Sequence, residues 1–337
     1  MKPTDVKAAL MFAISNKLPI LLKGAPGIGK SDIVAQAAKD SNAKLIISHP
    51  VVSDPTDYKG LPFPAENGRE AVFLPFGELN ELINTKDTTV FFLDDLGQAP
   101  ASVQAACMQL ILARRINGHK VSDKVVFFAA TNRREDRAGV TGILEPVKSR
   151  FSAIIELTPD IDDWVSWANQ NNMPMMLVSF IQFKPDFLYK WKPTADMTNS
   201  PCPRTVASVG KMVNCNIPEK LEFEMFSGAA GQGFAAEFNA YRKVYMSLPK
   251  IEEIMDNAES MAIPTDPAKM FAISGYIAHN NTAKNIPKLY KYIVRMPLEF
   301  QTLVMKSTAK IAKNINSKVT STNEFLDWSV KNSAVIF

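Results

Sequence analysis

The feature that most constrains this chain is the octapeptide GAPGIGKS, which runs from Gly24 to Ser31. It matches the phosphate-binding pattern G-x-x-x-x-G-K-[ST] at every fixed position. The apolar run 19–22 predicts a buried strand before the loop, and residues 32–38 predict a helix after it, which is the order that the pattern requires. A glycine-rich turn that only links strand to helix is the alternative, but it leaves Lys and Ser in register unexplained. The octapeptide therefore predicts a nucleoside triphosphate site.

Each part of this loop has a chemical reason. Its glycines allow the backbone to turn N–H groups toward a polyphosphate, and the start of the following helix adds partial positive charge. The ammonium group of Lys30 can reach the β- and γ-phosphates, and the hydroxyl group of Ser31 can ligate Mg²⁺. We expect all eight residues to bind the nucleotide: Gly24, Ala25, Pro26, Gly27, Ile28, Gly29, Lys30 and Ser31.

Composition sets wide limits around this site. A chain of 337 residues with 46% hydrophobic and 21% charged residues is typical of a folded, soluble protein of about two domains. The net charge of +4 neither requires nor excludes a polyanionic partner, because nucleic-acid binding depends on clustered basic residues. The three cysteines have neither disulfide-framework nor metal-type spacing, and no apolar run approaches the roughly 18 residues of a membrane span. We expect a cytoplasmic protein without a membrane anchor.

The pattern along the chain predicts an α/β fold followed by helices. Residues 1–158 alternate predicted strands with helices, which is typical of a mostly parallel sheet sandwiched by helices. The strands are expected near residues 19–22, 44–47, 89–93, 125–129 and 153–157. Beyond residue 158 the patterns are helical, with helices expected at 162–170, 175–182, from 201–203 onward, 228–246 and 264–285, and in the tail with a break at Pro297. We predict an ATPase core at 1–158, an all-α lid at 159–255 and a helical C-terminal extension at 256–337.

Two short hairpins are expected within the first part. Residues 49–77 are irregular and rich in Pro and Gly, but the apolar runs 61–63 and 70–74 flank Glu66-Asn67-Gly68 and predict a small hairpin. Asn117-Gly118 is a strong two-residue turn signal between residues 115–116 and 119–121. A loop as long as 49–77 usually serves a function.

Polar residues follow two of the predicted strands. Asp94 comes after a run of apolar residues and is placed to hold Mg²⁺, and the adjacent Asp95 could polarise an attacking water molecule. Asn132 ends the next strand, so its amide could orient water or contact the γ-phosphate. Arg133, Arg134, Arg137, Arg150 and Arg204 are more basic residues than one site needs, and for the first two we favour a surface role.

The segments GAPGIGKS, VFFLDDLGQAP, FFAATNRREDRAGV, VKSRF and SPCPRT, in this order, resemble the AAA+ ATPases, and within them the MoxR-like ATPases of bacteria and their phages. The resemblance covers residues 1 to about 250. It implies ATP and Mg²⁺ as cofactors, Lys30 and Ser31 as Walker A, Asp94 and Asp95 as Walker B, and Asn132 as sensor 1. It also implies that Arg150 is an arginine finger that reaches the next subunit and that Arg204 is sensor 2 on a helical lid.

The same resemblance implies a biological setting, and the chain departs from the family pattern at one position. MoxR-like proteins form rings, here expected as a hexamer in the cytoplasm of a bacterial cell or a phage-infected host, and act as chaperone-like remodelling ATPases on proteins with a von Willebrand factor A domain. Their two hairpins face the pore or upper surface, which makes Phe63, Phe73, Arg115, His119 and Lys120 candidate contacts, although packing and solvation are equally good explanations. The family usually places Glu where this chain has Asp95.

Two other function classes stay open at this point. Many AAA+ rings act on DNA, so a DNA-directed motor or loader is one alternative; it predicts DNA-stimulated hydrolysis, but no helix-turn-helix, zinc finger or basic tail supports it. The shorter carboxylate of Asp95 leaves a third interpretation, a nucleotide-gated scaffold that assembles with ATP without turning it over.

Overall fold

The computed structural model describes residues 1–66, 68–136, 142–194 and 196–333. The chain divides into two compact units, Met1–Asp160 and Ile161–Phe337. The first unit holds a sheet and the second is built from helices alone among the described residues. Within the described ranges no helix is both long and apolar enough to cross a membrane. The further division of the helical part at residues 255 and 256 stays a prediction.

The first unit is organised around a five-stranded parallel sheet with the order β2-β5-β8-β1-β9. The two central strands β5 and β8 are buried along their whole length, as continuous apolar runs predict for parallel strands covered on both faces. This architecture confirms the predicted α/β fold with a parallel sheet. The strands are β1 (Ile20–Lys23), β2 (Lys44–Ser48), β5 (Thr89–Leu93), β8 (Val125–Thr131) and β9 (Ala153–Glu156).

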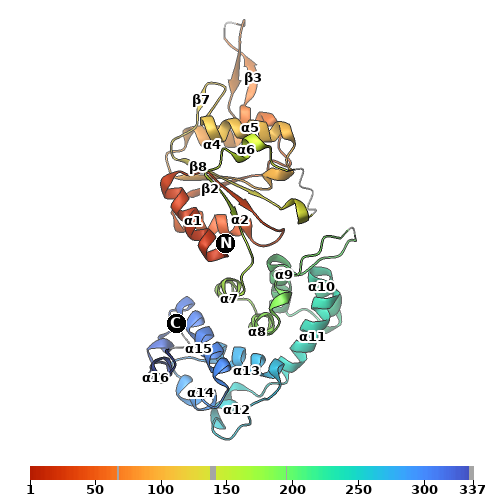
Figure 1. Ribbon diagram of the computed structural model, residues 1–337, viewed down its shortest axis with the longest axis vertical. Coiled ribbons are helices and arrows are strands. Elements are labelled where there is room, and N and C mark those ends of the chain that lie inside the picture. Colours follow the sequence, from red (N-terminus) through yellow and green to blue (C-terminus); the bar gives the residue numbers. More distant parts are fainter. Residues whose placement is uncertain (67, 137–141, 195, 334–337) are drawn as a thin grey trace. The chain divides into compact units, whose positions relative to one another are not determined.

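Helices cover both faces of this sheet (Figure 1). Helices α1 and α2 lie on one face, while α4, α5 and α6 lie on the other. On the second face, Leu79, Val103 and Leu110 pack against Phe91 and Phe127 of the central strands. The helical elements of this unit are α1 (Pro3–Asn16), α2 (Lys30–Asp40), α3 (Pro55–Lys59), α4 (Gly77–Asn84), α5 (Ala101–Ala113) and α6 (Glu145–Lys148), with 3₁₀ turns η1 (Leu96–Gln98) and η2 (Arg134–Asp136).

The span between β2 and β5 contains more structure than the sequence pattern indicates. Helix α3 begins at a capping box in which the Asp54 carboxylate accepts from the Thr56 N–H and the Asp57 carboxylate accepts from the Asp54 N–H. Because α3 has only five residues and starts at Pro55, it has no helical periodicity to detect. Helix α4 follows the predicted irregular stretch and buries Leu79 and Leu82.

Both predicted hairpins are confirmed. Strands β3 (Leu61–Pro64) and β4 (Ala71–Leu74) pair antiparallel, and so do β6 (Arg115–Ile116) and β7 (His119–Lys120). Asn67, in the expected turn of the first hairpin, lies outside the described residues. The β3-β4 hairpin extends away from the sheet (Figure 1), and the ring nitrogen Nε2 of His119 lies 2.7 Å from the carbonyl oxygen of Phe73. The two hairpins are therefore in direct contact.

The second unit consists of ten α-helices and two 3₁₀ turns in its described part. Its helices α10 and α12 were not expected, and Gly231 separates α10 from α11 where one helix from residue 228 was expected. Pro297 precedes α15, which confirms the predicted break. The elements are α7 (Ile161–Gln170), α8 (Met175–Phe183), η3 (Pro185–Phe187), α9 (Pro203–Asn214), α10 (Glu219–Ala230), α11 (Gln232–Met246), α12 (Ile251–Asp256), α13 (Pro267–Asn280), α14 (Ile286–Ile293), α15 (Leu298–Asn314), η4 (Lys318–Ser321) and α16 (Asn323–Lys331).

Aromatic side chains form the core between α8 and α11. The ring of Phe180 lies 5.5 Å from Phe234, 5.2 Å from Phe238 and 5.5 Å from Tyr241, measured between ring centroids. A second apolar cluster joins α12, α13, α14 and α15 through residues such as Ile254, Ile277, Leu289 and Val304. Such ring pairs add to the hydrophobic contribution of their burial, so the helical unit has a substantial core of its own.

Candidate nucleotide-binding site

The glycine-rich loop joins β1 to α2 at the carboxyl edge of the sheet. Gly27 and Gly29 have φ values of 72° and 96°, which residues with a side chain rarely adopt. Gly24 donates its N–H to the carbonyl of Thr131 at 3.2 Å, so the start of the loop is fastened to the end of β8. Helix α2 begins at Lys30, directly after the left-handed Gly29. The loop thus has the backbone conformation that a phosphate cradle requires.

Lys30 is buried at the centre of the site. Its ammonium group donates to the carbonyl oxygens of Gly24 and Ala25, both at 3.0 Å, and to Oδ1 of Asn132 at 2.6 Å. Only 7% of the residue is exposed. Strand β8 lies between β1 and β5, which is why Asn132, directly after β8, reaches the loop after β1. The chain therefore brings Lys30 and Asn132 together from positions 102 residues apart.

Ser31 and Asp94 form the second contact across the site. The Ser31 hydroxyl donates to Oδ2 of Asp94 at 2.6 Å. Hydroxyl and carboxylate oxygens are the ligands that Mg²⁺ prefers, and Mg²⁺ is usually held by one or two protein groups together with water and substrate phosphates. Within the described ranges there is no group of three or more His, Cys, Asp or Glu side chains that could hold a metal alone. This donor pair fits a magnesium ion that accompanies a polyphosphate.

Asp95 lies beside this pair in an unusual backbone conformation. Its φ of 56° and ψ of 33° place it in the left-handed region, immediately before η1. Oδ1 of Asp95 accepts from Nδ2 of Asn132 at 3.4 Å, and the Asp95 N–H donates to Oδ1 of Asp94 at 3.1 Å. Asn132 thus contacts Lys30 with its oxygen and Asp95 with its nitrogen, so one amide links the two sides of the site.

Sequence reasoning missed a supporting group behind Asp94. The N–H of Asp94 donates to the carbonyl of Ser48 at the end of β2, and the Ser48 hydroxyl lies 3.0 Å from the hydroxyl of Tyr58 on α3. Burial raises the pKa of Tyr58 to about 12, so this phenol stays protonated at neutral pH. The apolar pattern of β2 ending in a serine was the only signal in the sequence.

A second missed residue, Gln104, fixes the segment that leads to Arg150. Its side-chain amide is buried in α5, donates to the carbonyls of Ala99 and Gly142 at 3.0 Å, and accepts from the N–H of Leu144. Helix α6 and Arg150 follow this anchored segment. A glutamine between apolar neighbours in a helix pattern was its only signal.

The predicted arginines are distributed differently from the other site residues. Arg150 donates from Nη1 to the Ser149 hydroxyl at 3.3 Å, while its Nε is buried without a hydrogen-bond partner in the described part of the chain. Arg204 is exposed in the first turn of α9 in the second unit. Arg133 forms ion pairs with Asp136 and Glu156, which is consistent with the surface role favoured above. Arg137 lies outside the described residues.

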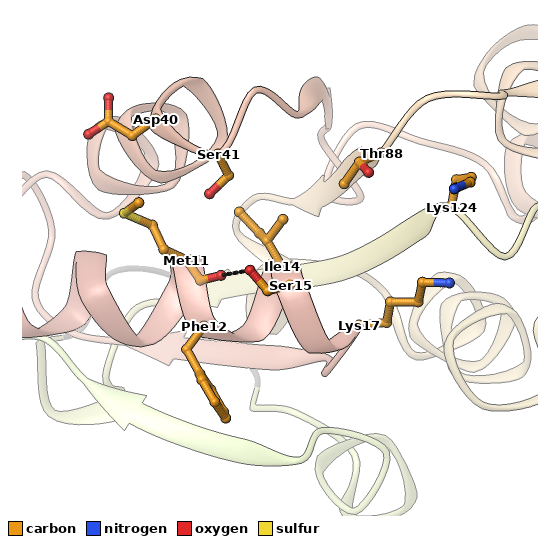
Figure 2. Close-up of a pocket in the computed structure, with 9 residues that line it drawn as sticks. All are labelled: Met11, Phe12, Ile14, Ser15, Lys17, Asp40, Ser41, Thr88 and Lys124. Atoms are coloured by element: carbon orange, nitrogen blue, oxygen red, sulfur yellow. Dashed lines mark hydrogen bonds between the residues drawn. The ribbon is translucent and has the colours of Figure 1, made fainter.

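A separate pocket of about 530 Å³ occupies the other edge of the sheet (Figure 2). Thr88 and Lys124, which line it, directly precede β5 and β8, whereas Asp94 and Asn132 follow the same strands. Ser15 and Lys17, at the end of α1, and Asp40 and Ser41, at the end of α2, complete its polar lining. Since the strands are parallel, this pocket is distinct from the phosphate loop.

Residues 20–159 match the model of the "ATPase family associated with various cellular activities (AAA)". The chain contains an AAA family ATPase domain. The matched residues include the whole sheet and every residue of the Lys30, Asp94 and Asn132 group. The narrower MoxR-like assignment stays a prediction.

Individual proteins are similar to this chain at low identity. Midasin from Giardia intestinalis is 28% identical over 191 residues, which are 53% of this chain but only 4% of that protein. The RuvB Holliday junction branch migration motor of Thermotoga maritima superposes with a TM-score of 0.41, at 14% identity over 97% of this chain and 87% of that one. NtrX from Brucella abortus, in complex with ADP, gives a TM-score of 0.41, at 14% identity over 97% and 67% of the two chains. Both TM-scores lie below 0.5, so these two likenesses say nothing about function.

Proposed function

We propose that this protein is a Mg²⁺-dependent ATPase of the MoxR type that assembles into a ring and remodels a protein partner. The observation that carries the proposal is the continuous polar network at the carboxyl edge of the sheet, in which Asn132 contacts both Lys30 and Asp95 while Ser31 contacts Asp94. These residues come from the ends of the adjacent strands β5 and β8 and from the phosphate loop after β1. Their arrangement supports binding and hydrolysis of ATP.

Each residue of the network has a role in this proposal. Gly24 to Ser31 hold the triphosphate, with the Lys30 ammonium group on the β- and γ-phosphates. Ser31 and Asp94 would hold Mg²⁺, which neutralises charge on the phosphates when it is bound. Asp95 accepts a proton from the attacking water, and Asn132 orients that water beside the γ-phosphate.

The roles proposed for the arginines require that several protomers assemble into a ring. A guanidinium group inserted from a neighbouring subunit can accelerate γ-phosphate transfer by about 10³ to 10⁵. Arg150 is half-buried, and in the described part of the chain its Nη groups form one hydrogen bond, to the adjacent Ser149 hydroxyl, so N–H donors remain for a γ-phosphate outside the protomer. Arg204 serves as the lid residue that senses the γ-phosphate. Repeated head-to-tail contacts would close the ring, with a hexamer as the expected size.

The partner is proposed from the hairpins and the family resemblance. Phe63 is 49% exposed and Arg115 and Lys120 are exposed, while His119 and Phe73 connect the two hairpins. We propose that this pair of hairpins contacts the client or a partner with a von Willebrand factor A domain. Loss of the γ-phosphate would release Arg150 and Arg204 and so move the hairpins with the rotating unit.

The proposal is tested by steady-state ATP hydrolysis with Mg²⁺ against protein concentration, while the particle size is measured in the same samples. We expect turnover to rise as the protein assembles, because each site needs a neighbour. Lys30→Ala should lose ATP binding, and the matched Lys39→Ala variant on the exposed end of α2 should keep it. Assembly without turnover would instead indicate a nucleotide-gated scaffold, and tight ATP binding by folded Lys30→Ala would contradict the role of Lys30.

A further inference from the structure

The end of the helical unit carries an unbalanced positive charge. Residues 267–323, which span α13, α14, α15 and η4, contain nine Lys and Arg residues but a single acidic residue, Glu299. The net charge of the whole chain is only +4, so positive charge is concentrated in this segment. A basic stripe along a helix is the electrostatic footprint of a polyanion-binding surface.

Part of this charge is neutralised within the unit. Lys288 and Lys291 of α14 pair with Asp256 and Glu259 at 3.1 and 2.7 Å, and Lys310 pairs with Asp162 at 3.1 Å. Arg295 donates to a backbone carbonyl. Five lysines remain that are exposed and form no ion pair among the described residues: Lys269, at the start of α13, and Lys284, Lys306, Lys313 and Lys318.

Lysines gather on one face and at the C-terminal end of α15, and all of them except Lys310 are unpaired among the described residues. Lys306, Lys310 and Lys313 follow the i, i+4, i+7 spacing of one helix face, opposite the buried Val304 and Thr308. Lys284 and Lys318 join them because Ile286, Ala312 and Val319, close to them in the chain, pack in one cluster. We call the five residues Lys284, Lys306, Lys310, Lys313 and Lys318 the α15 lysine patch; Figure 1 shows α15 in its helical unit.

We propose that the α15 lysine patch binds the phosphate backbone of double-stranded nucleic acid without reading its sequence. Protein–protein interfaces are depleted in Lys and enriched in Arg and aromatic residues, and the patch contains neither. Single-strand binding depends on aromatic rings that stack on bases, which the patch also lacks. Lys306 to Lys313 span about 10 Å of helix, which matches about three phosphates along one strand of a duplex.

Four of the five patch lysines are exposed and have no ion-pair partner in the described part of the chain. The acidic groups nearest to it in the chain are Glu299, on the first turn of α15, and Glu324 and Asp327 of α16, the last of which is held by Lys331 and Tyr290. Asp162 pairs with Lys310 and is 89% exposed at its side chain, so a phosphate can replace it. The surface is separate from the AAA family domain, so the proposal goes beyond the proposed ATPase function and does not depend on it.

The test measures binding of the full chain to a fluorescein-labelled DNA duplex of about 20 base pairs by anisotropy, from 50 to 300 mM salt. We expect micromolar binding at 50 mM salt and a slope of log K against log salt of about −3 to −4, because three or four phosphates are neutralised. Lys306→Gln/Lys313→Gln/Lys318→Gln should weaken binding at least tenfold and reduce the slope by about 3.

The control carries the same change of charge elsewhere in the unit. Lys192→Gln/Lys211→Gln/Lys220→Gln replaces three other exposed lysines and should bind like the wild type, with equal far-UV circular dichroism for all three proteins. Equal loss in both triple variants would overturn the proposal, as would absence of duplex binding at 50 mM salt. Displacement of the duplex by equimolar poly-glutamate, which has no phosphate, would overturn it in favour of an acidic protein partner.

Discussion

At the scale of single residues, Asn132 contacts both the lysine proposed to bind phosphate and the carboxylate proposed to activate water. Its side-chain oxygen accepts from Lys30 at 2.6 Å and its nitrogen donates to Asp95. One small amide therefore holds a cation proposed to contact phosphate and a carboxylate proposed to contact water. Replacing Asn132 by a charged residue should therefore affect both Lys30 and Asp95, whereas replacing it by a smaller neutral residue only removes the two hydrogen bonds.

Asn132→Asp should weaken ATP binding at least tenfold, because a carboxylate at this position pairs with Lys30 and repels the phosphates. Asn132→Ala should reduce ATP affinity only a few-fold while hydrolysis falls further, because Asp95 loses its amide partner. Calorimetric titration with ATP measures the first effect and steady-state turnover the second. Asn84→Asp adds the same charge on exposed α4 and should leave both unchanged; equal ATP affinity of the Asp and Ala variants at position 132 would contradict the charge argument.

At the scale of elements, η1 approaches the end of β8 closely beside the site. A Cβ atom placed on Gly97 would lie 2.1 Å from the Thr131 hydroxyl oxygen and 3.2 Å from its Cβ. Asp95 directly precedes η1 and Asn132 directly follows β8. The absence of a side chain at Gly97 therefore permits the approach of Asp95 and Asn132.

Gly97→Ala should destabilise the first unit by about 1 to 3 kcal/mol and lower turnover more than tenfold, because η1 must move away from β8. Adding Thr131→Ala removes the closer of the two contacts and should restore part of both. Urea unfolding and steady-state hydrolysis are the measurements. The matched variant Gly228→Ala, in helix α10 with nothing within 4 Å of the added Cβ, should instead stabilise its unit by about 0.5 to 1 kcal/mol. Unchanged turnover in Gly97→Ala would show that the approach is not needed.

The elements also show how far local pattern predicts a fold. The buried strands β5 and β8 and both hairpins followed from apolar runs and turn residues, which act over a few positions. Helix α3 could not be predicted in this way. Its capping box and the contact of Tyr58 with Ser48 of β2 hold it in place, and neither produces a periodic apolar pattern. Helix α10 was missed because it carries apolar side chains around much of its surface, with Leu221, Phe223 and Met225 all exposed.

The residues of the candidate site were easier to predict from the sequence than the residues that hold them in place. Lys30, Ser31, Asp94 and Asp95 lie in motifs, and parallel strands bring their ends to one edge whatever the strand order. The sequence did not indicate that β8 lies between β1 and β5, which is what allows Asn132 to contact Lys30 and Asp95. Ser48, Tyr58 and Gln104 act through contacts between distant segments, which no local pattern encodes.

At the scale of the whole molecule, each ATP site of the proposed ring is formed by residues from two protomers. Asp95 would act in its own protomer, whereas Arg150 would act in the neighbouring one. The Nη groups of Arg150 form one hydrogen bond among the described residues, to the adjacent Ser149 hydroxyl, which leaves donors for the site of a neighbouring protomer. Mixing two inactive variants can separate this arrangement from one in which both residues serve the same site.

Arg150→Ala and Asp95→Asn should each bind ATP with nearly wild-type affinity and hydrolyse it at least 100-fold more slowly, because neither change removes a phosphate-cradling group. In rings mixed at equal amounts, roughly a quarter of the sites combine an intact Asp95 with an intact Arg150 from the neighbour, so a similar fraction of wild-type turnover should return. The control replaces Asp95→Asn by the double variant Asp95→Asn/Arg150→Ala, which supplies no intact arginine and should restore nothing. Mixed rings are verified by differently labelled protomers; if they form and stay inactive, Arg150 does not act across the subunit boundary.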